Sequence, residues 1–224
     1  MQKIENKIIY NTTEEIVNPS HTALVVWDVQ NMFLNLIFNR QEFTSNLSSV
    51  IELARRANVP IFFTRHKPLP TRFESSARLG MMSRLDTRLG LDRIIQTATK
   101  EELDFVIKPK LSYQQQEEGQ EQEQEQNEIV IDKHTESIFI DTGFEHVLRS
   151  AGIVTVVFTG FATEYGIESS ARDSSSRGFY SVVASDCVSS PDKEGHNRSL
   201  ENMKKMITIT SSKDIEKIWS KYTN

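Results

Sequence analysis

The chain has 224 residues, enough for one α/β domain or two small ones with a sizeable core. Its net charge of −5 argues against general binding to nucleic acids or anionic membranes, because both need a positive surface, and no apolar run is long enough to span a bilayer. Residues 1–15 lack the apolar core of a secretory signal, and the single cysteine, Cys187, excludes a disulfide framework. We therefore expect a cytoplasmic protein.

Short apolar runs rich in β-branched residues alternate with helical patterns. The runs are continuous, which is typical of strands buried on both faces of a parallel sheet. They cover residues 22–28, 59–65, 153–160 and 180–186, with weaker runs at 128–132 and 206–211. Helices are predicted over 44–57, 142–152 and 211–222. This order predicts a doubly wound α/β sandwich, in which a mainly parallel, Rossmann-like sheet carries helices on both faces in a single domain over residues 1–224.

One segment differs in kind from the rest of the chain. Residues 114–126 contain only Gln, Glu and one Gly. This composition cannot form a packed core, so residues 112–127 are expected to be a solvated insertion within the domain.

Polar residues at the carboxyl ends of the strands are the candidates for chemistry, because ligands of such sheets gather there. Asp28 ends the first run, where apolar surroundings suit a carboxyl group to proton transfer; alternatively it caps the following helix. Lys133 ends the run at 128–132, which is the third in chain order. There it could hold Asp28 or a substrate oxygen; alternatively it is an ordinary surface lysine. Lys108 and Lys110 are rivals for the same role.

The stretch from Gly160 to Gly166 reads as a turn between a strand and a helix. The first amides of that helix, at Tyr165, Gly166 and Ile167, would point at a bound anion or a developing oxyanion. The turn therefore predicts an anion site without indicating a reaction.

Several cations follow the second run and could reach the same edge. They are Arg65, His66, Arg72 and Arg78. An arginine there could clamp a substrate carboxylate, although each could equally be a surface cation. The five histidines are scattered, so we expect no metal and no cofactor, and Cys187 is expected to be a structural thiol.

Several motifs together resemble the isochorismatase-like (cysteine hydrolase) superfamily over about residues 20–210. They are VVWDVQNMF, VPIFFTRHK, KHTESIF, VVFTGFATEYGIESSARD and SVVASDCVSSPDKEGH. The resemblance implies a six-stranded sheet, a homodimer or tetramer, and an Asp–Lys–Cys triad. Its aspartate falls on Asp28 and its lysine on Lys133, in the pattern completed by Ser137 and Phe139.

The resemblance also assigns the remaining site positions. The family nucleophile falls on Gly166, so a covalent thioester route is closed. Isochorismatases resemble this pattern and also carry glycine there; in them an aspartic acid protonates the enol ether and water attacks the resulting cation. A cis peptide is implied at Phe161–Ala162. The implied substrate-binding residues are Gln30, Phe33, His66, Arg78, Phe161, Ala162 and Tyr165.

Three functions are compatible with these residues. The first is a hydrolase that acts on a small, anionic molecule by acid–base chemistry, with Asp28 and Lys133 as the working pair. The second is an inactive relative that serves as a binding or scaffold protein. The third is an amidohydrolase of the nicotinamidase or N-carbamoylsarcosine amidase type, with water activated by Asp28 or Glu164. The first is favoured, because both working residues are present although the thiol is not.

Overall fold

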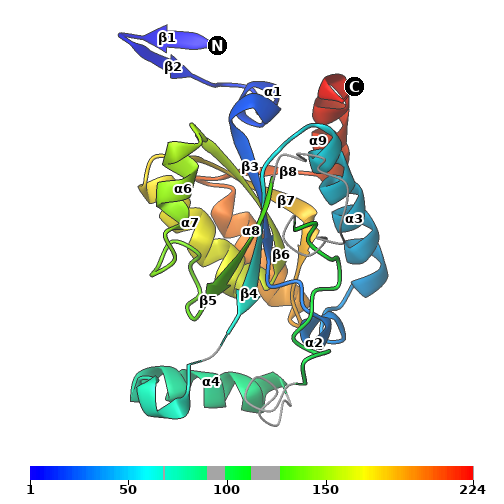
Figure 1. Cartoon of the computed structure of the whole chain (residues 1–224), viewed down its shortest axis with the longest axis vertical. Helices are drawn as coiled ribbons and strands as arrows, with labels where there is room; N and C mark the ends of the chain where they lie inside the picture. Colours follow the sequence, from blue (N-terminus) through cyan, green and yellow to red (C-terminus); the bar gives the residue numbers. More distant parts are fainter. Residues whose placement is uncertain (68, 90–98, 112–126, 224) are drawn as a thin grey trace, which may run out of the picture.

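Six parallel strands form the central sheet of the computed structural model, which describes residues 1–67, 69–89, 99–111 and 127–223 (Figure 1). Their order across the sheet is β5-β4-β3-β6-β7-β8, and every neighbouring pair is parallel. The strands are β3 (Thr22–Trp27), β4 (Ile61–His66), β5 (Glu128–Lys133), β6 (Thr155–Phe161), β7 (Tyr180–Ser189) and β8 (Thr208–Thr210). They coincide with the six predicted runs, and the α/β sandwich is confirmed.

Helices cover both faces of the sheet (Figure 1). One face packs against α3 (Arg40–Arg56) and α9 (Ser212–Trp219), and the other packs against α6 (Phe144–Ser150), α7 (Glu168–Ser176) and α8 (Lys193–Met203). Strands buried on both sides need apolar side chains throughout, and all six residues of β3 are buried.

The predicted helices differ from the observed ones mainly at their ends. Helix α3 begins four residues earlier than the pattern at 44–57 suggested. Helix α6 begins at Phe144, two residues after the predicted start at 142, and its N-cap is Gly143, with a φ of 63°. Helix α9 is capped by Ser211, whose side chain accepts the amide of Asp214, and it continues into the short helix η5 (Ser220–Tyr222). These corrections leave the layers of the sandwich unchanged.

Two elements stand away from the sheet and were not predicted. The hairpin of β1 (Gln2–Ile4) and β2 (Lys7–Ile9) projects at one end of the molecule, and α4 (Ser76–Leu89) lies beyond the carboxyl ends of β4 and β5 (Figure 1). The short helices α1 (Thr13–Ile16) and α2 (Asn31–Leu34) flank β3. Of the predicted insertion at 112–127, only Asn127 lies within the described residues. Within the described ranges, no helix is both long and apolar enough to cross a membrane.

The edge strand β5 is fixed to α3 by a buried ion pair. Arg55 donates through Nε to Oε1 of Glu128 at 2.6 Å and through Nη2 to Oε2 at 3.2 Å. The two side chains are 12% and 6% exposed. The amide of Lys110 also donates to Glu128, at 2.6 Å. This anchor holds the strand whose last residue is Lys133.

We predict that Glu128→Gln lowers the free energy of unfolding by about 2 kcal/mol, because it removes the enclosed carboxylate that Arg55 contacts through Nε and Nη2 and leaves only the exposed Glu52 as a charged partner. Urea denaturation measures the change. Glu201→Gln, in the exposed pair with Lys204, is the matched control and should change stability by less than about 0.5 kcal/mol. Equal effects of the two variants would contradict the anchoring role.

Candidate active site

A buried ion pair lies at the carboxyl edge of the sheet. The ammonium of Lys133 donates to Oδ2 of Asp28 at 2.6 Å, and the two side chains are 0% and 2% exposed. Thr64 of β4, between the two strands, donates through Oγ1 to Oδ1 of Asp28 at 2.6 Å and accepts the Asp28 amide at 2.9 Å. Both alternatives are therefore wrong: Asp28 does not cap the helix, and Lys133 is no surface lysine.

The surroundings of Lys133 are mostly apolar. Its ammonium lies 3.4 Å from the centroid of the Trp27 ring and also donates to the carbonyl of Thr135 at 3.3 Å. Burial lowers the pKa of Lys133, while the neighbouring Asp28 carboxylate acts in the opposite direction. The proton between Lys133 and Asp28 is therefore shielded from water. This arrangement is suited to proton transfer.

The Trp27 indole occupies the space in front of Gly166. A Cβ built on Gly166 would lie 2.1 Å from Cη2 and Cζ2 of Trp27 and 2.4 Å from Cε2. No side chain fits at position 166 while the indole stays there. The sequence pattern does not reveal this role, since a tryptophan at the end of an apolar strand looks like any core residue. Its position directly before Asp28 was the available signal.

The turn that follows β6 contains the expected cis peptide, Phe161–Ala162. The predicted anion site is not supported, however. The chain after Ala162 forms the short helix η4 (Thr163–Ile167), in which the amides of Tyr165 and Ile167 donate to the carbonyl of Ala162 at 3.3 and 3.2 Å. Two of the three amides expected to face an anion are therefore already bound.

His66, at the end of β4, and Gln30, in the segment after β3, lie next to each other at the same edge of the sheet. Gln30 is fully buried; it accepts the His66 amide at 3.1 Å and donates to the carbonyl of Leu103 at 2.7 Å, so its amide positions His66. Burial lowers the pKa of His66 to about 4, with smaller effects from the charges of Asp28 and Lys133. The imidazole is therefore neutral at pH 7.

The arginine expected to clamp a substrate carboxylate already has partners. Nη1 of Arg78 donates to both carboxylate oxygens of Glu136 at 2.9 and 3.1 Å, and Nε lies 3.6 Å from Glu74. Arg65 similarly pairs with Asp132 at 2.7 Å. The exposed Arg72 lies over the ring of its neighbour Phe73.

The rival lysines lie outside the site. Lys108 forms an ion pair with Asp104, Lys110 lies 4.0 Å from Glu52, and both side chains are 67% exposed. This settles the choice among the three lysines in favour of Lys133.

Aromatic side chains line the neighbouring wall. The ring of Phe33 stacks on that of Phe161, with centroids 4.8 Å apart, and Ala162 is buried beside them. The half-buried Tyr165 packs against the same apolar cluster. The structure thus brings these residues together on one side of the turn.

Other side chains that could act as a nucleophile or a base are engaged elsewhere. Burial raises the pKa of the Cys187 thiol, which keeps it neutral. Ser170 accepts the amide of Ile138 at 3.2 Å, and Oε1 of Glu164 accepts the hydroxyl of Ser190 at 2.6 Å. None of the three contacts Asp28 in the described part of the chain.

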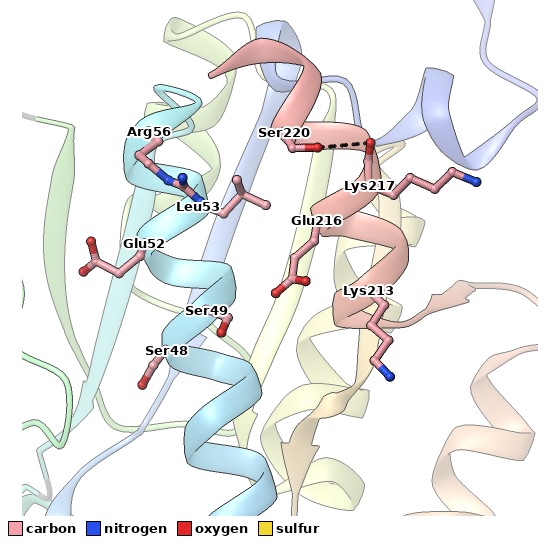
Figure 2. A pocket seen from close by; sticks show the side chains of 9 residues that line it. All are labelled: Ser48, Ser49, Glu52, Leu53, Arg56, Lys213, Glu216, Lys217 and Ser220. Atoms are coloured by element: carbon pink, nitrogen blue, oxygen red, sulfur yellow. Dashed lines mark hydrogen bonds between the residues drawn. The ribbon is translucent and has the colours of Figure 1, made fainter. Parts of the chain in front are cut away.

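A groove of about 730 Å³ lies between α3 and α9, in the helical layer that these two helices form on one face of the sheet (Figure 2). Glu216 points from α9 toward α3, whereas Lys213 and Lys217 point away from it (Figure 2). The groove is lined by Ser48, Ser49, Glu52, Leu53, Arg56, Lys213, Glu216, Lys217 and Ser220. None of the site residues borders it, and its open mixture of charges indicates no reaction.

Comparison with known proteins is consistent with this geometry. Residues 22–214 match the isochorismatase domain. Nicotinamidase 3 of Arabidopsis thaliana is 27% identical over 194 residues, covering 87% of this chain and 86% of the relative. Ureidoacrylate amidohydrolase RutB of Pseudomonas syringae pv. syringae is 27% identical over 216 residues, covering 88% and 83%. A cysteine hydrolase structure from Pseudomonas syringae pv. phaseolicola superposes with a TM-score of 0.71 at 17% identity, covering 92% and 96%, and this likeness concerns the fold.

We predict that Gly166→Ala lowers the free energy of unfolding by about 1–3 kcal/mol, because the added methyl group overlaps the Trp27 indole. Gly80→Ala is the matched control, since its nearest atom would be the end of the Arg84 side chain at 3.6 Å. Trp27→Val should remove most of the alanine penalty in a double-mutant cycle. The same penalty in both backgrounds would show that the indole does not occupy this space.

The pKa of His66 predicts how stability depends on pH. The folded protein keeps His66 neutral down to about pH 4, whereas the unfolded chain binds a proton below about pH 6.5, so stability falls as the pH decreases through this range. The difference corresponds to about 3 kcal/mol. The free energy of unfolding of the wild type, relative to that of His66→Gln, should therefore fall by up to about 3 kcal/mol between pH 7 and pH 4. A difference that is constant with pH would contradict this assignment.

Proposed function

Since the chain belongs to the isochorismatase family of hydrolases, we propose that it hydrolyses a small molecule by proton transfer from the Asp28–Lys133 pair, without a covalent intermediate on the chain. The observation that carries this proposal is the buried 2.6 Å contact of the pair beside a position that has no side chain. Acid–base groups are present, whereas the described residues bring no activated nucleophile to them.

An enol ether is the substrate class that suits this site best, because its cleavage needs a proton and water but no nucleophilic side chain. Lys133 gives a proton to Asp28, which passes one to the terminal carbon of the C=C bond and so produces an oxygen-stabilised cation. Water adds to the cation and returns a proton to the Asp28 carboxylate. The hemiketal then collapses to an alcohol and a carbonyl compound. Asp28 passes the returned proton back to Lys133, which restores the ion pair.

A second candidate is a non-catalytic binding protein. It is supported by the burial of the pair, whose side chains are 0% and 2% exposed, and by the indole that fills the space before Gly166. The amidohydrolase alternative has less support. Amide cleavage in the resembling family depends on a thiol, and a Gly166→Cys variant would need a smaller residue at position 27 to make room for it.

We also propose that the protein acts in the cytoplasm as a dimer or tetramer. Large apolar side chains are exposed on the β1–β2 hairpin, on α4 and in the segment just before α4, which supports self-association. They are Ile4 at 53%, Ile8 at 53%, Phe73 at 70% and Met81 at 38% exposure.

We predict that Asp28→Asn lowers kcat at least about 100-fold, because the amide retains the shape of the carboxyl group but cannot transfer its proton. Isochorismate and simpler vinyl ethers are the first substrates to assay, followed by nicotinamide and ureidoacrylate, the compounds named in its relatives. Asp132→Asn is the matched control: it removes a carboxylate beside Lys133 that pairs with Arg65 and Lys67 at the surface. It should change kcat by less than about twofold.

Equal turnover by wild type and Asp28→Asn would remove Asp28 from the mechanism. Ligand-induced thermal stabilisation of the wild type without any product would favour the non-catalytic alternative.

A further inference from the structure

Besides Nε of Arg78, which lies 3.6 Å from a carboxylate oxygen of Glu74, two buried nitrogen atoms beside the ion pair have no hydrogen-bond partner among the described residues. They are Nε1 of Trp27 and Nε2 of His66, whose residues are 6% and 9% exposed. A buried polar atom without a partner destabilises the folded protein by about 1–3 kcal/mol, so such atoms call for an explanation. A ligand that bonds both of them would remove this penalty.

The indole N–H lies on the edge of the ring that faces the turn after β6. Nε1 is bonded to Cε2, the atom 2.4 Å from a Cβ built on Gly166. The indole fills the position where the resemblance puts a nucleophile, and its N–H is a hydrogen-bond donor at the margin of that position. His66 pairs in register with Lys133 on the neighbouring strand, so the two side chains leave the same face of the sheet, and the Lys133 ammonium lies 3.4 Å from the centroid of the Trp27 ring. Both orphan nitrogens therefore flank the ion pair.

The charges around these nitrogens do not favour an anion. Three carboxylates, Asp28, Glu74 and Glu136, surround two cations, Lys133 and Arg78, and each cation already has a carboxylate partner. His66 is neutral at pH 7. A bound carboxylate would add a fourth negative charge and would have to displace an existing partner.

We propose that Trp27 is a substrate-contacting residue that selects an uncharged small molecule, whose carbonyl or ether oxygen accepts the indole N–H while a second polar atom bonds Nε2 of His66. This inference rests on the proposed function and specifies the substrate class of the same site. It differs from the anionic substrate expected from the sequence, because the arginine on which that expectation depended is paired.

The inference is tested by binding, measured separately from turnover. Isothermal titration calorimetry compares matched amide and carboxylate pairs: acetamide with acetate, and benzamide with benzoate. The amide of at least one pair should bind at least about tenfold more tightly than its carboxylate, in the millimolar range that fragments of this size reach. Tighter binding of the carboxylates, or binding of no compound, would overturn the inference.

Two variants identify the residue responsible. Trp27→Phe keeps an aromatic ring near Lys133 but lacks the N–H, and it should weaken amide binding about five- to tenfold while affecting the carboxylates less. A loss that is equal for amides and carboxylates, or no loss, would contradict the donor role. Trp219→Phe is the matched control, since Trp219 is fully buried and donates to the carbonyl of Val17 at 2.7 Å. Its amide affinity should match that of the wild type.

The control variant also reports the location of the ligand. The chain contains two tryptophans, so Trp219→Phe leaves Trp27 as the only source of tryptophan fluorescence. Amide binding should change this emission, and an unchanged emission at saturation would contradict contact with Trp27. Trp27-dependent amide binding without product would leave this inference standing while the proposed function fails. Turnover that needs Asp28 but not the Trp27 N–H would do the reverse.

Discussion

The buried ion pair between Asp28 and Lys133 is the interaction on which the site depends. Two charges removed from water are tolerated only when their hydrogen bonds are satisfied and their geometry is good. The sheet meets this condition by placing β4 between β3 and β5, so that Thr64 supplies a hydroxyl to one carboxylate oxygen while Lys133 contacts the other. The Trp27 ring covers the ammonium from the apolar side. Strand order, therefore, is a requirement of the chemistry as well as of the fold.

The same indole links the ion pair to the turn after β6. The Trp27 ring excludes a side chain at position 166. The Trp27 backbone lies so close to β6 that a Cβ on Gly160 would be 2.2 Å from the Trp27 carbonyl oxygen. Two glycines are thus matched to one tryptophan. The site therefore has no room for a reactive side chain at position 166. An aromatic ring with one N–H group occupies that place instead. For this reason we favour acid–base chemistry on an uncharged substrate.

Much of the fold could be predicted because buried parallel strands have a simple signal, a continuous apolar run, and all six runs formed strands. The pairing of Asp28 with Lys133, 105 residues apart, followed only from the resemblance, since each residue alone had a more ordinary explanation. Contacts between distant side chains were not predictable. Nothing in the sequence near Arg78 indicates that Glu136 neutralises it, and Trp27 has the same apolar pattern as its neighbours in β3.

The central claim is that the Asp28–Lys133 pair transfers a proton to carbon during cleavage. The most direct test is the hydrogen isotope in the product when an uncharged vinyl ether is hydrolysed in D2O and the carbonyl product is analysed at once by mass spectrometry. The account predicts one deuterium on the carbon that was the terminal carbon of the double bond, in a reaction that Asp28→Asn abolishes. Enzyme-catalysed product without that deuterium, or with it at an undiminished rate in Asp28→Asn, would contradict the account.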